Sequence, residues 1–369
     1  EFRWSQEALA GYGFQTVVNV IYSVSPRHTL DYYARKTREA VAINPYRICF
    51  KDVGGLLTPE TARPFISTVM QNAGDVPVEF HAHCNNGFGP YAALIAAEEG
   101  VQYLHTAIPP LANASSLPSV FDVVTNLHAR GHAVDLDLEA LERVRRHFHQ
   151  VAQIDDLPVG SALTYDEELY THQVPGGMIS NLRFQLSQIG AEDKLPQVLE
   201  EASLVRKELG YPIMVTPLSQ FVGSQAAINV LSASRYDNVT DEVIQYALGL
   251  WGREAPEVMD QDVRDRILAR PRARELAAAS TEQDNPSLAE LRRRHGGITD
   301  DELVTLYYVG QLGTQAPRSI EDLPTSYDDY LSSRQSLTDV VRVLASLPRI
   351  SRVAVTTPRG SFTVTQRTR

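Results

Sequence analysis

Two short apolar segments, one β/α unit apart along the chain, end in side chains that could hold a metal ion. Segment 47–52 carries Lys51 near its end, and segment 78–83 carries His81 and His83. Alternate residues of a strand point to the same face, so both imidazoles can be aimed at one point beside Lys51. Because two neutral imidazoles suit a divalent transition metal, the spacing predicts a metal site at these strand ends.

Lysine is the unusual member of this set, because a metal cation repels a charged ammonium group. Lys51 could join the site as a neutral amine, or after reaction with carbon dioxide, since the resulting carbamate is anionic and offers oxygen ligands. Such an open-sided site acts as a Lewis acid on a bound carbonyl and stabilises the enolate formed when the neighbouring carbon gains or loses a carboxyl group. A His-x-His pair can also be structural, and Asp52 could either support a ligand or cap the next turn.

The elements that must position these residues alternate between short strands and amphipathic helices. We expect parallel strands over 16–22, 47–51, 77–82 and 101–105, with helices over 29–42, from Thr58 onward, and over 90–99. Four such units make half of an eight-stranded barrel, in which the chemistry lies at the C-terminal ends of the strands. An open doubly wound sheet uses the same units, but no glycine-rich dinucleotide fingerprint follows a strand in this sequence.

After Pro109 and Pro110 the pattern becomes mostly helical. The predicted helices span 119–130, 138–152, 193–209, 218–233 and 241–250, and the loops 172–178 and 215–217 each precede a helix. A polar linker over 281–287, a helix over 288–294 and a β-hairpin within 352–365 follow. We therefore expect an α/β protein with three regions: 1–117, a partial barrel with the metal site; 118–280, a mostly helical domain; and 281–369, a linker, a helix and a β-hairpin tail.

Composition narrows the class of protein. The 369 residues carry a formal net charge of -11, so no general affinity for nucleic acid is expected. The sequence shows no membrane-spanning apolar run and no signal-peptide pattern. With Cys49 and Cys84 as its only cysteines, it is not a disulfide scaffold, and we predict a cytoplasmic location. It begins with Glu1 in what looks like the middle of a helix, which suggests a piece of a longer protein.

Several motifs in a fixed order resemble the carboxyltransferase domain or subunit of biotin-dependent carboxylases. The similar families are pyruvate carboxylase, the oxaloacetate decarboxylase alpha subunit and the transcarboxylase subunit that acts on pyruvate. The matching segments are FKDVGGLLTP at 50–59, HAH at 81–83, LHTA at 104–107, HQVPGGMISNL at 172–182 and VTPLSQFVG at 215–223. The resemblance implies the C-terminal part of a TIM (β/α)8 barrel, followed by a helical funnel domain over the site and the small hairpin tail.

The resemblance also implies the roles of individual residues. In that family, a carbamylated lysine matching Lys51 and two histidines matching His81 and His83 bind the metal, which we expect to be zinc, manganese or cobalt. Biotin on a carrier delivers or removes the carboxyl group of a 2-oxo acid such as pyruvate or oxaloacetate. A threonine credited with proton transfer aligns with Ser115, so Lys51 and Ser115 are the implied catalytic residues. The 172–178 and 215–217 segments resemble structural loops of the funnel.

Some expected parts are absent from this sequence. The family's barrel begins with strands that carry an aspartate ligand and a substrate-binding arginine, and this sequence starts after both. It contains no Met-Lys-Met biotinylation sequence, so we expect a biotin carboxyl carrier protein and a biotin carboxylase as partners, and a homo-oligomer or a partner that supplies the missing strands. Two alternatives remain open: a biotin-independent aldol lyase or Claisen-type synthase with the same barrel and metal, and a non-catalytic subunit that needs a partner.

Overall fold

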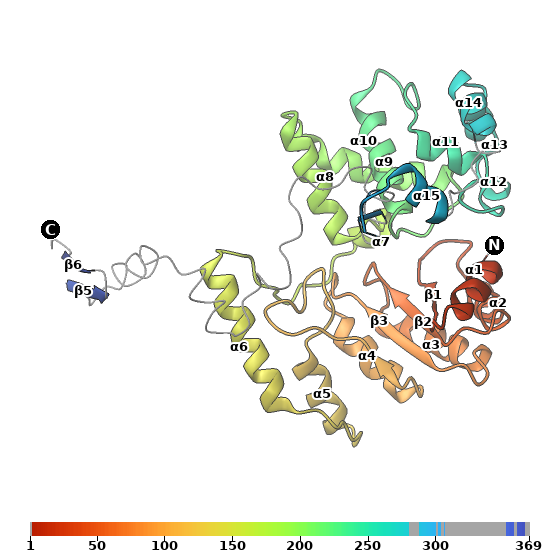
Figure 1. Ribbon diagram of the computed structural model, residues 1–369. Helices are drawn as coiled ribbons and strands as arrows, with labels where there is room; N and C mark the ends of the chain where they lie inside the picture. The colour runs from red at the N-terminus through yellow and green to blue at the C-terminus, as the bar shows by residue number, and fades with distance from the viewer. Residues whose placement is uncertain are drawn as a thin grey trace. The chain divides into compact units, whose positions relative to one another are not determined.

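The structure is a computed structural model that describes residues 2–279, 288–299, 302–303, 306, 352–357 and 360–365. It divides into two compact units, Glu1–Gln283 and Asp284–Arg369. Figure 1 shows both, and each is described here by itself.

A parallel four-stranded sheet forms the N-terminal part of the first unit. Its strands β1 (Val17–Ile21), β2 (Arg47–Asp52), β3 (Val78–Ala82) and β4 (Tyr103–Leu104) lie in chain order (Figure 1). Helix α1 (Phe2–Gly11) precedes β1, and α2 (Leu30–Val41), α3 (Pro59–Asn72) and α4 (Gly89–Glu98) connect the strands. The predicted β/α alternation and the helix at the start of the chain are confirmed.

The fourth strand is shorter than the predicted 101–105. The amide of Val101 donates to the carbonyl of Ala96 at 2.9 Å, so it ends helix α4 instead of joining the sheet. Gly100 adopts φ +93 at this point, the left-handed conformation with which helices often end. Pairing with β3 then begins at Tyr103, and the amide of His105 still donates to the carbonyl of Phe80 at 2.8 Å.

The two faces of the sheet differ in polarity. Ile48, Phe50, Val78 and Phe80 are buried in a core with apolar residues of the connecting helices. Because side chains alternate along a strand, residues 47, 49 and 51 of β2 and 79, 81 and 83 of the third segment point to the opposite face. That face carries the polar side chains, so the register of the sheet decides which of them meet.

Side-chain caps begin three helices of the first unit. The side chain of Thr29 caps α2, and Thr58 and Thr61 form a reciprocal capping box at the start of α3. Ser119 caps α5 (Val120–Ala129) in the same way. These caps fix the residues at which α2, α3 and α5 begin.

The remainder of the first unit is helical. The elements are α6 (Leu138–Ile154), α7 (Glu168–His172), α8 (Gly176–Gln188), the 3-10 helix η1 (Glu192–Lys194), α9 (Leu195–Glu208), α10 (Leu218–Leu231), α11 (Asp241–Ala247), α12 (Ala255–Val258), α13 (Gln261–Leu268) and α14 (Pro271–Ala279). A second apolar core that includes Val174, Leu182, Val205 and Phe221 holds them together. The helical character of this region is therefore as predicted.

Two details differ from the expected pattern. The helix predicted over 193–209 divides into η1 and α9, because Pro196 suits the first turn of a helix but cannot donate an amide inside one. Gly176 and Gly177, expected in a loop, form the first turn of α8, where the amides of Met178 and Ile179 bond to the carbonyl of Pro175.

Side chains from the helical part bind the segment that follows β1. Gln173 accepts a hydrogen bond from the amide of Val24 at 3.1 Å and donates to its carbonyl at 2.6 Å. The guanidinium of Arg206 donates to Ser23 Oγ at 2.9 Å and to the Val24 carbonyl at 3.1 Å. Because Ser23, Gln173 and Arg206 are all buried, this clamp fixes the helical part at the C-terminal end of β1.

The second unit contains the predicted helix α15 (Leu288–Arg294) and hairpin, whose antiparallel strands are β5 (Arg352–Thr357) and β6 (Gly360–Thr365). The predicted linker over 281–287 lies outside the described residues.

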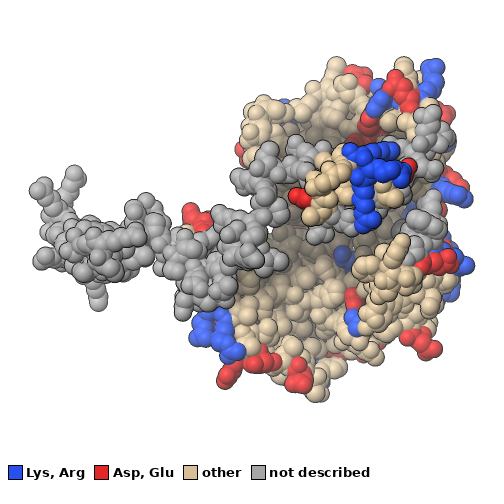
Figure 2. Space-filling view, in the orientation of Figure 1, with Lys and Arg blue, Asp and Glu red and all other residues tan. Residues whose placement is uncertain are grey.

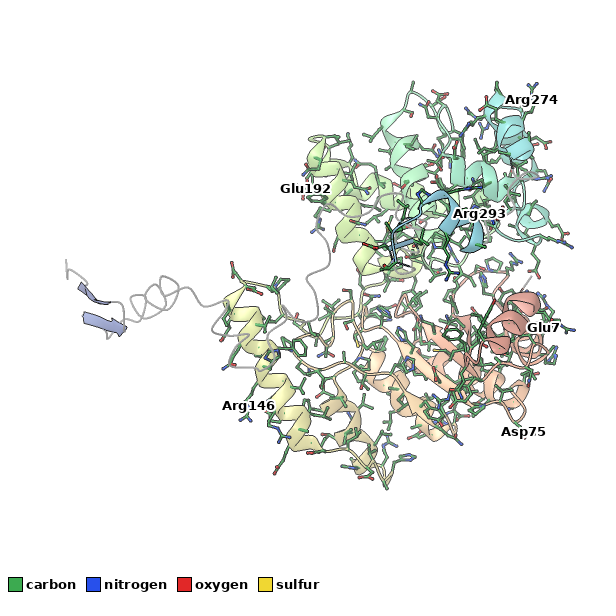
Figure 3. The ribbon with its side chains drawn as sticks, in the orientation of Figure 1. Glu7, Asp75, Arg146, Glu192, Arg274 and Arg293 are labelled. Carbon is green, nitrogen blue, oxygen red and sulfur yellow. The ribbon has the colours of Figure 1, made fainter. Side chains whose placement is uncertain are left out.

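Charged side chains are scattered over the outside of the first unit (Figure 2). Glu7, Asp75 and Arg146 are exposed and project from it (Figure 3). Acidic and basic side chains lie close together at the α6 end, as Figure 2 shows. In the part of the chain that the structure describes, each helix is too short or too polar to cross a membrane.

Candidate metal centre

Three imidazoles meet on the polar face of the sheet, at the ends of β3 and β4. The Nε2 atoms of His81 and His83 lie 3.1 Å apart, and His81 Nδ1 lies 3.0 Å from His105 Nδ1. The backbone amide of His83 donates to the carbonyl of Asp52 at 2.9 Å, which continues the β2–β3 pairing past Ala82. The predicted convergence of His81 and His83 is therefore present in the fold.

The hydrogen bond made by His83 determines which of its nitrogens is free. Its Nδ1 atom lies 2.6 Å from the backbone carbonyl oxygen of Ser115. A carbonyl oxygen only accepts, so Nδ1 must carry the proton, and in the neutral ring Nε2 is left with its lone pair. That lone pair faces His81 Nε2, as required of a metal ligand.

The surroundings keep both rings neutral. Burial is the main cause that lowers the pKa of His81 to about 3, and the charge of Lys51 acts in the same direction. Burial also lowers the pKa of His83, and although the Ser115 carbonyl opposes this change, Lys51 adds to it. Neutral imidazoles are the form that binds metals, so the pair is prepared for a cation near neutral pH.

Lys51 and Ser115 lie at the same place, in different ways. Lys51 pairs with His81 in the β2–β3 register. Its side chain is half-buried, and its charge lowers the pKa of both His81 and His83. Ser115 is exposed and contacts His83 through its carbonyl oxygen. A Cβ atom placed on Gly176 would lie 3.2 Å from Ser115 Cβ and 2.8 Å from Asn85 Oδ1, so glycine allows the first turn of α8 to approach this loop.

The histidine pair fits a divalent metal. Two nitrogens bound at about 2.0–2.1 Å to a tetrahedral zinc ion lie about 3.3 Å from each other. The 3.1 Å between the two Nε2 atoms is close to that spacing. The donor set of two imidazoles, with a lysine that could become a carbamate, suits a borderline ion such as zinc, manganese or cobalt.

The Asp52 side chain holds the backbone at the end of β2 and does not contact a candidate metal ligand. Its carboxylate accepts the backbone amides of Leu56 and Leu57, each at 2.8 Å. Burial nevertheless raises the pKa of Asp52 to about 6, against the effect of those bonds. Of the two roles considered for this residue, the structure shows the turn cap, which holds the chain immediately after Lys51.

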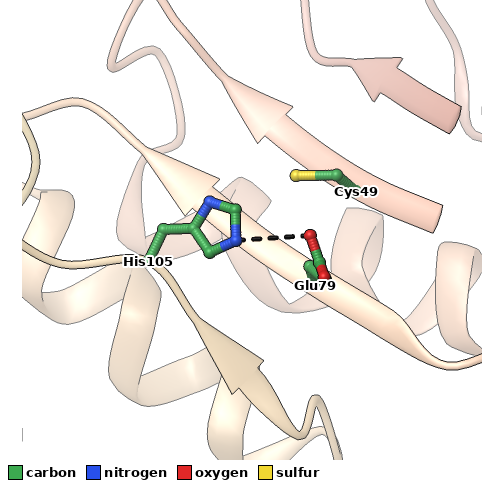
Figure 4. A group of neighbouring side chains, drawn as sticks. All are labelled: Cys49, Glu79 and His105. Atoms are coloured by element: carbon green, nitrogen blue, oxygen red, sulfur yellow. Dashed lines mark ion pairs between the residues drawn. The ribbon is translucent and has the colours of Figure 1, made fainter. Parts of the chain in front are cut away.

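A further polar group on the same face was not predicted. Cys49 Sγ, Glu79 and His105 bring potential ligand atoms within 4.8 Å of one another (Figure 4). Glu79 accepts from Arg47 at 2.8 Å, and its second oxygen lies 3.3 Å from His105 Nε2. Cys49 is buried, and burial raises the pKa of its thiol to about 12, so it stays protonated at neutral pH. The signal was available, because residues 49 and 79 precede Lys51 and His81 by two positions.

Comparison with known protein families divides the chain in two. Residues 12–147 match the HMGL-like family, and residues 169–317 match the family described as a conserved carboxylase domain. The first segment contains the sheet and the histidines, and the second includes helices α8 to α15.

The chain is also similar to carboxylase and carboxyltransferase subunits. The chain is 38% identical over 253 residues to a pyruvate carboxylase subunit of Methanothermobacter thermautotrophicus, covering 68% of this chain and 44% of that protein. It is 30% identical to the methylmalonyl-CoA carboxyltransferase 5S subunit of Propionibacterium freudenreichii, covering 78% of this chain and 57% of that protein. The chain thus spans about half the length of these relatives.

Solved structures show the same fold. The carboxyl transferase domain of Rhizobium etli pyruvate carboxylase with pyruvate and biocytin superposes with a TM-score of 0.73 at 22% identity. The match covers 90% of this chain and 56% of that one. With an HMGL-like α/β segment followed by a conserved carboxylase domain, the chain belongs to the carboxyltransferase domains of biotin-dependent carboxylases.

Proposed function

We propose that the chain provides the carboxyltransferase site of a biotin-dependent enzyme that moves a carboxyl group between carboxybiotin and a 2-oxo acid of the pyruvate or oxaloacetate type. One observation carries this proposal. In a chain of this family, the Nε2 atoms of two neutral imidazoles, His81 and His83, lie 3.1 Å apart beside Lys51. Relatives named as pyruvate carboxylase subunits support the choice of substrate.

The residues of the chain take distinct roles in this proposal. His81 and His83 would hold a divalent metal through Nε2, and Lys51, as a carbamate formed with carbon dioxide, would add an oxygen ligand. When bound, the metal supplies the Lewis acidity that polarises the carbonyl of the substrate. Ser115, exposed beside His83, would carry a proton through its hydroxyl group between biotin and substrate.

Other components would complete the site. We propose that the four strands form half of a TIM barrel whose remaining strands bring an aspartate ligand and a substrate-binding arginine, as the family resemblance implies. The partial barrel would extend to about residue 117, with the helical domain from there to about 280.

A separate biotin carboxyl carrier protein and a biotin carboxylase would be the partners, in a homo-oligomer or with a chain that supplies strands. We place the reaction in the cytoplasm, since both cysteines are free and buried.

Carboxyl transfer with a defined carrier tests the proposal. The protein is incubated with biotinylated carrier and oxaloacetate, and pyruvate release and carrier carboxylation are measured together. We expect turnover that depends on biotin and falls by about 100-fold or more in H83N and K51Q, because each removes a metal ligand. Metal content by mass spectrometry should fall with activity.

A matched control uses a polar residue outside the site. R143Q changes an exposed side chain of α6 and should leave turnover unchanged. Cleavage of the substrate without biotin would favour the aldol lyase or synthase alternative. A protein that binds metal but remains inactive until a partner chain is added would indicate the incomplete subunit.

A further inference from the structure

A chain of polar contacts leads from the proposed metal ligand His81 to the far end of the polar face, through an imidazole–imidazole hydrogen bond and an ion-pair contact. His81 Nδ1 lies 3.0 Å from His105 Nδ1, and His105 Nε2 lies 3.3 Å from a carboxylate oxygen of Glu79. The other oxygen of Glu79 accepts from Arg47 at 2.8 Å. Each link joins one side chain to the next, so the position of one proton restricts all the others.

Metal binding permits one arrangement of these protons. If His81 Nε2 holds a metal, the proton of the neutral ring must be on Nδ1. His105 Nδ1 then has to accept this proton's hydrogen bond, so the proton of neutral His105 is on Nε2. That Nε2–H group lies 3.3 Å from an oxygen of Glu79, whose other oxygen accepts from Arg47, so the carboxylate is the nearby group that can take the proton's charge.

From this arrangement we infer that His105 and Glu79 are positioning residues for the metal centre, which fix the ring of His81 in the tautomer that leaves Nε2 free. The inference rests on the proposed function, because it concerns the same metal. Ligand histidines commonly donate their second N–H group to a carboxylate or a carbonyl. In this protein His83 uses the Ser115 carbonyl, whereas His81 reaches a carboxylate through a second imidazole.

The same proton count argues against a second metal at Cys49, Glu79 and His105. A metal on His105 Nε2 would move the proton of that ring to Nδ1. His81 Nδ1 would then have to accept the hydrogen bond that this proton makes. His81 Nε2 would then carry a proton and could not be a ligand. Glu79 is also already paired with Arg47. The two arrangements exclude each other, so experiment can separate them.

Three variants of the full-length protein test the positioning role. H105L removes both ring nitrogens, whereas H105N keeps an acceptor near the position of Nδ1. C49S alters the alternative metal site and leaves the relay intact. Affinity for Co²⁺ is measured by competition with a chromogenic chelator in bicarbonate buffer, and circular dichroism of the metal-free proteins checks that each has folded.

We expect H105L to weaken Co²⁺ binding by about 10- to 100-fold, the usual effect of losing a partner of a ligand histidine. H105N should restore most of the affinity, and C49S should not change it. In the Zn²⁺-loaded protein with ¹⁵N-labelled histidine, long-range ¹H–¹⁵N spectra should show the proton of His81 on Nδ1 and that of His105 on Nε2.

The possible failures are distinguishable. Equal Co²⁺ affinity of H105L and the unsubstituted protein, or a proton on His105 Nδ1, would overturn the relay and leave the proposed function standing. A thiolate-to-Co²⁺ absorption band that disappears in C49S would overturn it in favour of the alternative site. If the unsubstituted protein bound no Co²⁺, the metal centre of the proposed function would fail together with the relay.

Discussion

Neighbouring oxygen atoms decide where the protons lie on the clustered imidazoles. The Ser115 carbonyl fixes the proton of His83, and Glu79 can fix that of His105. Neither the Ser115 carbonyl nor Glu79 is proposed to bind the metal held by His81 and His83. Each nevertheless determines whether a nitrogen lone pair faces that metal. Ser115 therefore has a structural role through its backbone that is separate from the proposed role of its hydroxyl group.

A fourth histidine, away from this centre, should contribute to the loss of stability at acidic pH. His28 is buried, with Nδ1 2.7 Å from Ser25 Oγ. Burial is the main cause that lowers its pKa to about 3, and Arg206 and Arg27 contribute. The unfolded chain binds a proton on this residue below about pH 6.5 and the folded chain does not, so stability present above that pH is lost as the pH falls.

The variant H28Q removes this contribution. Between pH 7 and pH 5, the unsubstituted protein should lose about 2 kcal/mol more unfolding free energy than H28Q, as urea denaturation at both pH values would measure. The matched control is H128Q, at an exposed position of α5, which should follow the unsubstituted protein. Parallel pH profiles for H28Q and the unsubstituted protein would contradict the prediction.

The elements that position the site were predictable where the signal is local. Apolar alternation predicted the strands, and Thr58 followed by Pro59 predicted the start of α3, because both signals depend on neighbours in sequence. The role of His105 was not predictable, because its contacts with His81 and Glu79 depend on the register of β4 against β3. The Val101 amide donates to a carbonyl at the end of α4, so the pairing of β4 with β3 begins only after this residue.

The first turn of α8 should be sensitive to the size of one residue. In G176A the new methyl group would lie 2.8 Å from Asn85 Oδ1 and 3.2 Å from Ser115 Cβ, so either α8 or the loop must move. We expect a loss of about 1–3 kcal/mol in unfolding free energy, together with weaker metal binding, because the Ser115 carbonyl shifts. Urea denaturation and chelator competition measure the two effects.

The adjacent glycine provides the control. A Cβ atom on Gly177 meets nothing within 4 Å, so G177A should be neutral or slightly stabilising in the same helical turn. Equal stability of the two variants would show that α8 adjusts without cost and that the close approach at Gly176 is unimportant.

At the scale of the first unit, a buried clamp connects two apolar cores. One core lies between the sheet and α2 to α4, and the other lies among the later helices. Burial lowers the pKa of Arg206 to about 10, which leaves it charged at neutral pH. It donates to Ser23, Val24 and Pro212, so it ties the end of β1 to the helical part.

The clamp should make the two cores unfold together. R206M leaves the Pro212 carbonyl without this donor and removes the bond to Ser23, so we expect a loss of about 1–3 kcal/mol. Hydrogen exchange should rise in segment 21–28 and in α9 before global unfolding. K207M, at an exposed position of the same helix, is the control and should exchange like the unsubstituted protein. If the unsubstituted protein already melts in two separate transitions, or if R206M matches K207M, the clamp does not couple the cores.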